Sequence, residues 1–215
     1  AANLAVHAAC FQEGVEHLRE VWSNFDSSQV YRTDWPGVLS SAIRWLSNLS
    51  LGLFNKTAPV SLLDNQPLAA LLTRSLDLQR LPASIQAGHL RALCITACSY
   101  TRGDSVSFYQ GDSDLEDWGR ARRRGHRCEL GINHLMASSA IPLLFPAVEL
   151  DGEYYGDGAL RQLAPVSPAL HLGARRILVI GSGASGGSQG RRMTSGVVGA
   201  IETSRRTRAA PWRVT

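Results

Sequence analysis

The sequence predicts an α/β protein with a largely parallel central sheet. Two observations lead to this prediction: short apolar runs typical of buried strands occur at residues 93–98 and 176–180, and stretches with helical spacing lie between them. The 215 residues are 44% hydrophobic and 19% charged, which is the composition of a globular chain with a substantial core. No uninterrupted apolar stretch approaches the roughly 20 residues that span a bilayer, so the sequence argues against an integral membrane protein.

The first part of the chain is predicted to be helical. Apolar side chains recur every three or four positions over residues 1–25, which predicts one continuous helix. No Ser, Thr or Asp cap precedes it, so the sequence opens as if inside a helix. Residues 35–54 are also amphipathic, and residues 61–75 predict a shorter helix entered through the stretch 64–67, whose proline is tolerated in a first turn.

Strands predominate from residue 90 onward. The predicted strands are residues 93–98, 105–110, 147–150, 153–155 and 176–180. Asp151-Gly152 is a dipeptide favoured in tight hairpin turns and separates two of them. The predicted helices of this part are residues 132–139 and 167–172.

Two stretches of the second half are predicted to lie outside regular structure. The arginine-rich run Arg120 to Arg127 predicts a solvated basic loop. A Gly/Ser-rich stretch at 181–190 precedes residues 191–215, for which we expect an Arg-rich tail or a final helix. The main domain is therefore predicted to cover residues 1–190.

Asp157 is the residue that the sequence marks most clearly as a candidate for catalysis. It lies between Gly156 and Gly158, and glycines allow the backbone to turn sharply and let another chain or a ligand approach closely. A carboxylate held in such a place can accept a proton from a nucleophile. An ordinary Asp-Gly turn is the alternative interpretation of the same residues.

The surrounding residues resemble a known family. Ala137 to Pro142, then Phe145-Pro146, then Asp157-Gly158-Ala159 occur in the order found in the C-terminal half of the patatin-like phospholipases, and the resemblance covers roughly residues 1 to 181. It implies a three-layer fold with a mostly parallel central sheet. It also implies a lipid acyl hydrolase with a Ser–Asp dyad, in which the aspartate takes the proton of the serine and no cofactor or metal takes part.

The resemblance assigns roles to individual residues. Asp157 would be the general base, and Gly158 and Ala159 would form the backbone turn that follows it. Ser138, Ser139 and Pro142 would line or brace the site. The expected partner is a lipid or acyl-ester substrate, with peripheral contact to an anionic membrane surface and a cytoplasmic or membrane-peripheral location. No nucleic acid is expected.

The chain departs from the family pattern in one large respect. The family places its oxyanion loop and its G-x-S-x-G serine elbow upstream of the Asp-Gly-Ala triplet, and neither occurs before Asp157. We therefore expect a chain that starts just after the nucleophile and lacks the first strand or strands. Residues 1–215 alone are then expected to be inactive.

Two other interpretations remain open. Ser185 lies in a G-x-S-x-G, but no histidine follows it and it comes after Asp157, so it fits neither the α/β-hydrolase order nor the patatin order. Gly181, Gly183 and Gly186 match the dinucleotide-binding spacing. The alternative function is thus a non-catalytic nucleotide- or anion-binding module that uses Gly181–Gly187 or Arg120–Arg127.

Overall fold

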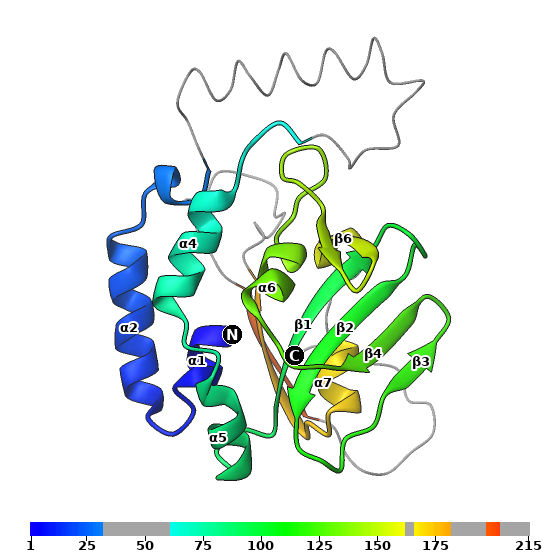
Figure 1. Ribbon diagram of the computed structural model, residues 1–215. Coiled ribbons are helices and arrows are strands. Elements are labelled where there is room, and N and C mark those ends of the chain that lie inside the picture. The colour runs from blue at the N-terminus through cyan, green and yellow to red at the C-terminus, as the bar shows by residue number, and fades with distance from the viewer. Residues whose placement is uncertain (32–60, 162–165, 182–196, 203–215) are drawn as a thin grey trace, which may run out of the picture. The chain divides into compact units, whose positions relative to one another are not determined.

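The computed structural model describes residues 1–31, 61–161, 166–181 and the strand at 197–202 (Figure 1). The chain divides into two compact units, Ala1–Leu163 and Ala164–Thr215, and each is described here by itself. The helix predicted over residues 35–54 and the serine at position 185 lie outside the described residues. None of the described helices is long and apolar enough to cross a membrane.

The predicted helix over residues 1–25 is wrong as a single element, because the chain forms two helices, α1 (Ala2–Val6) and α2 (Phe11–Ser23). The side chain of Asn3 explains the break, since its amide donates to the carbonyl of Gly14 at 2.7 Å and ties α1 to α2. A Cβ on Gly14 would lie 2.8 Å from the Cβ of His7, so only glycine allows this close approach. The short helix η1 (Ser27–Gln29) follows, and the Asp26 carboxylate caps it.

Three further helices belong to the first unit: α4 (Gln66–Ser75), α5 (Arg80–Gln86) and α6 (Ile132–Ser138). The prediction of a helix with Pro67 in its first turn is confirmed, although the helix begins at Gln66 rather than at residue 61. The Asp64 carboxylate accepts a hydrogen bond from the Gln66 amide at 2.9 Å, which satisfies one of the N–H groups that a helix start leaves without a partner.

A six-stranded sheet in the order β3-β4-β2-β1-β6-β5 lies beside these helices. Its strands are β1 (Ala92–Ser99), β2 (Ser105–Gly111), β3 (Trp118–Arg120), β4 (Arg123–Arg127), β5 (Val148–Leu150) and β6 (Glu153–Asp157). In Figure 1, helices α1, α2, α4 and α5 gather on one side of the sheet. Alternate side chains of β1 (Leu93, Ile95 and Ala97) face this side and join a buried core with Leu81 of α5 and Ala137 of α6.

The prediction of a mostly parallel sheet is wrong, because the β2–β4 pair is the one parallel pair among the five. The short connections explain this result, since a two-residue loop can join only antiparallel neighbours. Asp151-Gly152 joins β5 to β6 with φ angles of 49° and 76°, the positive values of a hairpin turn. Strand β3 comes between β2 and β4 in the chain and provides the crossover that their parallel pairing needs.

The basic run from Arg120 to Arg127 belongs largely to strands β3 and β4, which corrects the prediction of a loop, whereas Arg120, Arg122 and Arg123 are solvent-exposed as predicted. The ring of Trp118 covers Gly125 so closely that a Cβ there would collide with it, and this contact holds β3 against β4. Arg127 donates to the carbonyls of Gly111, Asp112 and Leu115 and lies 5.3 Å from the centroid of the Tyr109 ring. These contacts with neutral carbonyls and an aromatic ring give Arg127 a structural role. The sequence alone could not predict them.

The second unit contains α7 (Val166–His171), β7 (Arg176–Gly181) and β8 (Val197–Glu202). The predicted helix and strand over residues 167–172 and 176–180 are confirmed. A strand occupies residues 197–202 of the stretch for which a tail or a final helix was expected. It runs antiparallel to β7, whereas a dinucleotide-binding βαβ unit requires parallel strands, so this pair argues against the nucleotide alternative.

Candidate active site

Asp157 is the last residue of β6 and lies half-buried opposite Ala97 of β1. Its backbone amide donates to the carbonyl of Ala140 at 2.9 Å, which ties the end of β6 to the segment that follows α6. Its carboxylate Oδ1 accepts a hydrogen bond from the Ala159 amide at 2.9 Å and caps the short helix η2 (Gly158–Leu160). The carboxylate is therefore held in one orientation by the turn that it starts.

The two glycines beside Asp157 allow close contacts with β1 and with Tyr100, the residue that follows it. A Cβ on Gly158 would collide with the carbonyl oxygen of Thr96, and a Cβ on Gly156 would collide with the hydroxyl of Tyr100. Both contacts depend on the missing side chain and not on an unusual φ angle. The sequence prediction of a close approach at these glycines thus describes the packing of β6 and η2 on β1.

The serines predicted to brace the site make different contacts. Ser138 donates its hydroxyl to the Thr96 carbonyl at 2.7 Å, the same oxygen against which Gly158 packs. Ser139 donates to the carbonyl of Leu135 at 2.9 Å, one turn earlier in α6. Pro142 lies half-buried in the following loop. Ser138 therefore connects α6 to the strand that supports Asp157, whereas Ser139 stays within its own helix.

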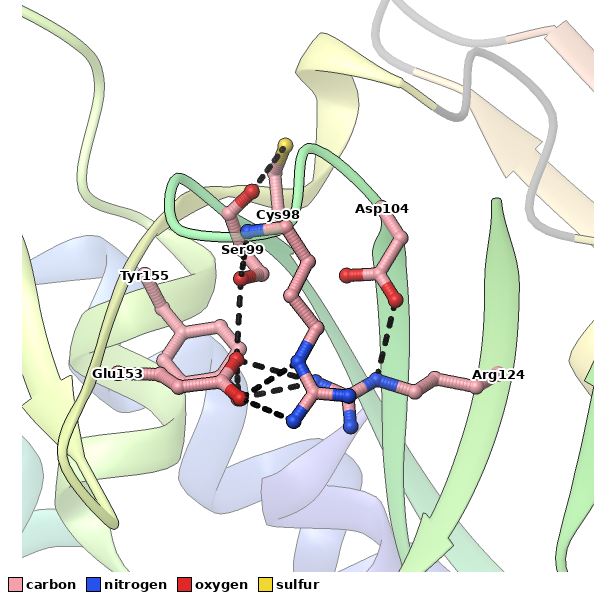
Figure 2. A network of polar contacts seen from close by, with 7 residues as sticks. Cys98, Ser99, Asp104, Arg124, Glu153 and Tyr155 are labelled. Atoms are coloured by element: carbon pink, nitrogen blue, oxygen red, sulfur yellow. Dashed lines mark hydrogen bonds and ion pairs between the residues drawn. The ribbon is translucent and has the colours of Figure 1, made fainter. Parts of the chain in front are cut away.

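The other end of β6 is held by charges. Figure 2 shows Arg124 between Asp104 and Glu153, with Ser99 and Tyr155 at the same Glu153 carboxylate. Ser99, Tyr155 and Arg124 each approach Glu153 Oε2 at 3.1 Å, and the guanidinium of Arg102 approaches Oε1 at 2.7 Å. We call these residues the Glu153 network. It connects β6 to the end of β1, to the turn that follows it and to β4.

The network changes the acidity of its members. Burial acts to raise the pKa of Glu153, but hydrogen bonds from Ser99, Tyr155 and Arg102 and the charge of Arg102 outweigh it and lower the pKa. Burial first, and then the Glu153 carboxylate, raise the pKa of Tyr155 to about 12. At neutral pH the network therefore contains an ionised glutamate and a neutral tyrosine.

A family model described as patatin-like phospholipase matches residues 1–170. The chain belongs to this family. The match includes β6, α6, η2 and the whole six-stranded sheet, and family membership suggests a lipid acyl hydrolase that acts on ester bonds. Comparisons with curated proteins and with solved structures gave no match.

Sequence reasoning missed two residues of the patatin-like domain, Cys98 and Tyr100, whose electrostatic environment includes Asp157. Burial raises the pKa of the Cys98 thiol; the guanidinium of Arg161 opposes this, and the carboxylates of Asp104 and Asp157 add to it. Burial also raises the pKa of Tyr100, with smaller contributions from Cys98 and Asp157. Because Cys98 pairs with Gly156, strand alternation places its side chain on the sheet face opposite to that of Asp157. Only the register of β1 on β6, which the sequence does not show, brings these groups near the aspartate.

His134 has a structural role at the start of α6. Its Nδ1 accepts from the Gly131 amide at 3.0 Å, and its Nε2 lies 3.6 Å from the thiol of Cys128. Burial lowers the pKa of His134, so the ring is neutral at physiological pH. No group of three or more His, Cys, Asp or Glu side chains in the described part of the chain is arranged to hold a metal ion.

A surface hollow of about 440 Å³ lies at the start of α6 rather than beside Asp157. Leu76, Leu78, Leu130 and Ile132 contribute apolar atoms to it, and the charged lining residues are Arg74, Asp77 and Glu129. None of its lining residues belongs to β6 or to the turn that follows it, so the hollow is not lined by the candidate site.

Proposed function

We propose that the protein hydrolyses carboxylic ester bonds of lipids, with Asp157 as the general base for a serine nucleophile. One observation supports the role of Asp157 beyond family membership: the Ala159 amide holds Oδ1 in one orientation, and Oδ2 has no hydrogen-bond partner among the described residues. A base must be positioned before its pKa matters, and this turn provides the positioning.

The proposed reaction proceeds in two steps. Asp157 takes the proton from the serine hydroxyl as its oxygen attacks the ester carbonyl, and the proton then passes to the departing alcohol as the ester C–O bond breaks. In the second step Asp157 takes a proton from water, whose oxygen attacks the acyl-enzyme, and returns it to the serine as the fatty acid leaves. Backbone N–H groups would stabilise the oxyanion in both steps.

The nucleophile is the first part of the proposal to test, because residues 1–156 contain no G-x-S-x-G. We expect the coding sequence upstream of Ala1 to contain that motif within about ten residues, at the strand-to-helix elbow typical of such serines. Its absence there would contradict the proposed serine. A fluorophosphonate probe that labels this serine in the translated protein, and still labels a Ser185→Ala variant, would separate the two candidate nucleophiles.

The role of Asp157 is tested by Asp157→Asn in the protein that includes those upstream residues. The amide oxygen of asparagine still accepts from Ala159, so the fold is retained while the proton acceptor is lost. We expect kcat for p-nitrophenyl butyrate to fall by about 10²–10⁴-fold, the usual contribution of a general base.

Asp151→Asn is the matched control, because it removes an exposed carboxylate from the β5–β6 turn and asparagine tolerates the positive φ there. This variant is expected to keep its full turnover and its melting temperature. Unchanged kcat in Asp157→Asn would remove Asp157 from the mechanism.

A further inference from the structure

Several large apolar side chains of the loop between α6 and β5 are exposed to solvent. Ile141, Leu143 and Leu144 are 41%, 70% and 39% exposed, and no charged residue occurs between Ser138 and Val148. Leu62, which is 40% exposed, lies on the neighbouring segment before α4. We call these four residues the apolar loop.

The backbone holds this arrangement in a conformation that leucine disfavours. Leu143 has a φ angle of 68°, in the left-handed region where a bulky side chain is a genuine outlier. The Leu62 amide donates to the Leu143 carbonyl at 2.9 Å, and the Leu63 amide donates to the Leu144 carbonyl at 2.8 Å. A third bond joins the Phe145 amide to the Ile141 carbonyl at 2.9 Å. The exposed leucines are thus fixed in place by three hydrogen bonds, and strain of this kind often marks a functional segment.

The apolar loop is directly connected to the candidate site. Ile141 follows Ala140, whose carbonyl accepts from the Asp157 amide at 2.9 Å. The first exposed residue of the loop is therefore the direct neighbour of the residue that anchors the Asp157 backbone. This continuity links the exposed side chains to the backbone that positions Asp157.

We propose that the apolar loop docks onto the surface of aggregated lipid and brings Asp157 to the esters of that surface. The inference rests on the proposed function, because it names the physical form in which the substrate is bound. When leucine and isoleucine side chains enter the boundary between headgroups and acyl chains, the removal of their apolar area from water stabilises the bound state.

The chemistry of the loop favours a lipid surface over a protein partner. Protein interfaces surround their apolar centre with polar and charged groups that fix the register of the two partners. The stretch from Ser139 to Val148 has no charged side chain to do so, and insertion into lipid does not require one. The resulting contact is expected to depend on apolar area and only weakly on the headgroup charge.

The test measures binding of the 215-residue chain to vesicles by co-sedimentation, with phosphatidylcholine alone and with phosphatidylglycerol added. The test variant combines Leu143→Asn with Leu144→Ser, since asparagine accepts the positive φ of position 143. We expect its partition coefficient to fall about tenfold or more on both vesicle types, because two inserted leucines are removed.

Phe11→Ser is the control variant, because Phe11 is 59% exposed on α2, outside the loop. It is expected to bind vesicles as the unchanged chain does. Unchanged partition of the Leu143/Leu144 variant, or a loss caused by Phe11→Ser instead, would overturn the proposal. So would binding that needs phosphatidylglycerol and disappears in salt, or a dimer that sedimentation shows to be lost in the loop variant.

The two proposals fail in different ways. If the Leu143/Leu144 variant loses vesicle binding while Asp157→Asn keeps full turnover, docking stands and the proposed mechanism falls. If Asp157→Asn loses turnover of a soluble monomeric ester while the loop variant still binds vesicles, the mechanism stands and docking falls. In the protein that includes the upstream residues, a loop variant with normal turnover of monomeric ester but reduced hydrolysis of vesicular lipid supports both.

Discussion

The two ends of β6 hold their carboxylates by opposite means. At Glu153 both oxygens are occupied, by two guanidinium groups and two hydroxyls, and the side chain is only 16% exposed. At Asp157 the contacts are mainly those of the backbone. Its neighbouring glycines pack on Thr96 and Tyr100, its amide donates to Ala140, and one carboxylate oxygen accepts from Ala159.

This difference separates a structural carboxylate from a candidate base. Glu153 has committed its acceptor sites, and its lowered pKa makes it a poor acceptor for a further proton. Among the described residues Asp157 makes no ion pair, and its carboxylate is positioned by a backbone amide alone. The comparison predicts that changes at the Asp157 end act through packing, and that changes at the Glu153 end act through charge and depend on pH.

The largest effect on stability is expected for Gly158→Ala. The new Cβ would overlap the Thr96 carbonyl oxygen, a backbone atom that cannot move without displacing β1. We expect a loss of about 3 kcal/mol of unfolding free energy, at the upper end for overpacked sites, measured by urea denaturation.

Gly119→Ala is the control for this change, because nothing lies within 4 Å of a Cβ at that position and its φ angle is ordinary. It should alter the unfolding free energy by less than about 0.5 kcal/mol. Equal effects of the two substitutions would show that close packing on β1 does not determine the position of the Asp157 turn.

A somewhat smaller effect is expected for Glu153→Gln. The change removes the charge that pairs with Arg124 and Arg102, and the exposure of Arg102 weakens part of this interaction. We expect a loss of about 2 kcal/mol at pH 7, typical of hydrogen bonds to charged groups.

The pH dependence separates charge from packing at this position. Because folding lowers the pKa of Glu153 from 4.5, its stabilisation is fully present above pH 4.5 and is lost as the pH falls through the folded-state value. The difference between the unchanged chain and Glu153→Gln should therefore shrink in urea titrations below pH 4.5. A difference that stays constant down to the most acidic value would contradict the charge-based account.

The smallest effect is expected for Ser138→Ala, which removes the donor to the Thr96 carbonyl and leaves that oxygen with one contact fewer. We expect about 1 kcal/mol, the usual net value of one hydrogen bond, in thermal or urea unfolding. Ser139→Ala is the comparison, because its hydroxyl bonds only within α6, and it should change the stability less. The reverse order would indicate that Ser139 rather than Ser138 supports the site.

Elements defined by local chemistry could be predicted from the sequence. The apolar run of β1, the Asp151-Gly152 turn and Pro67 in the first turn of α4 all depend on residues a few positions apart. The two helices at the start of the chain could not be predicted, because the contact of Asn3 with Gly14 interrupts an otherwise continuous periodicity.

The candidate site divides in the same way. Asp157 and its glycines stand out in the sequence, since an aspartate between two glycines is a local pattern. The Glu153 network draws on β1, the turn after it, β4 and β6, so it exists only once the register of the sheet is set. The mixed direction of the strands likewise depends on loop lengths that were visible in the sequence, although the apolar runs alone favoured a parallel arrangement.

The four cysteines, all free thiols, have a practical consequence for spectroscopy. Burial raises the pKa of Cys94 and of Cys128 to about 11 and also raises that of Cys98, and a protonated thiol reacts slowly with maleimides. Cys10 is exposed in the turn between α1 and α2. A fluorophore can thus be attached at one defined point of the natural sequence, where it would report on the helical hairpin without any engineered cysteine.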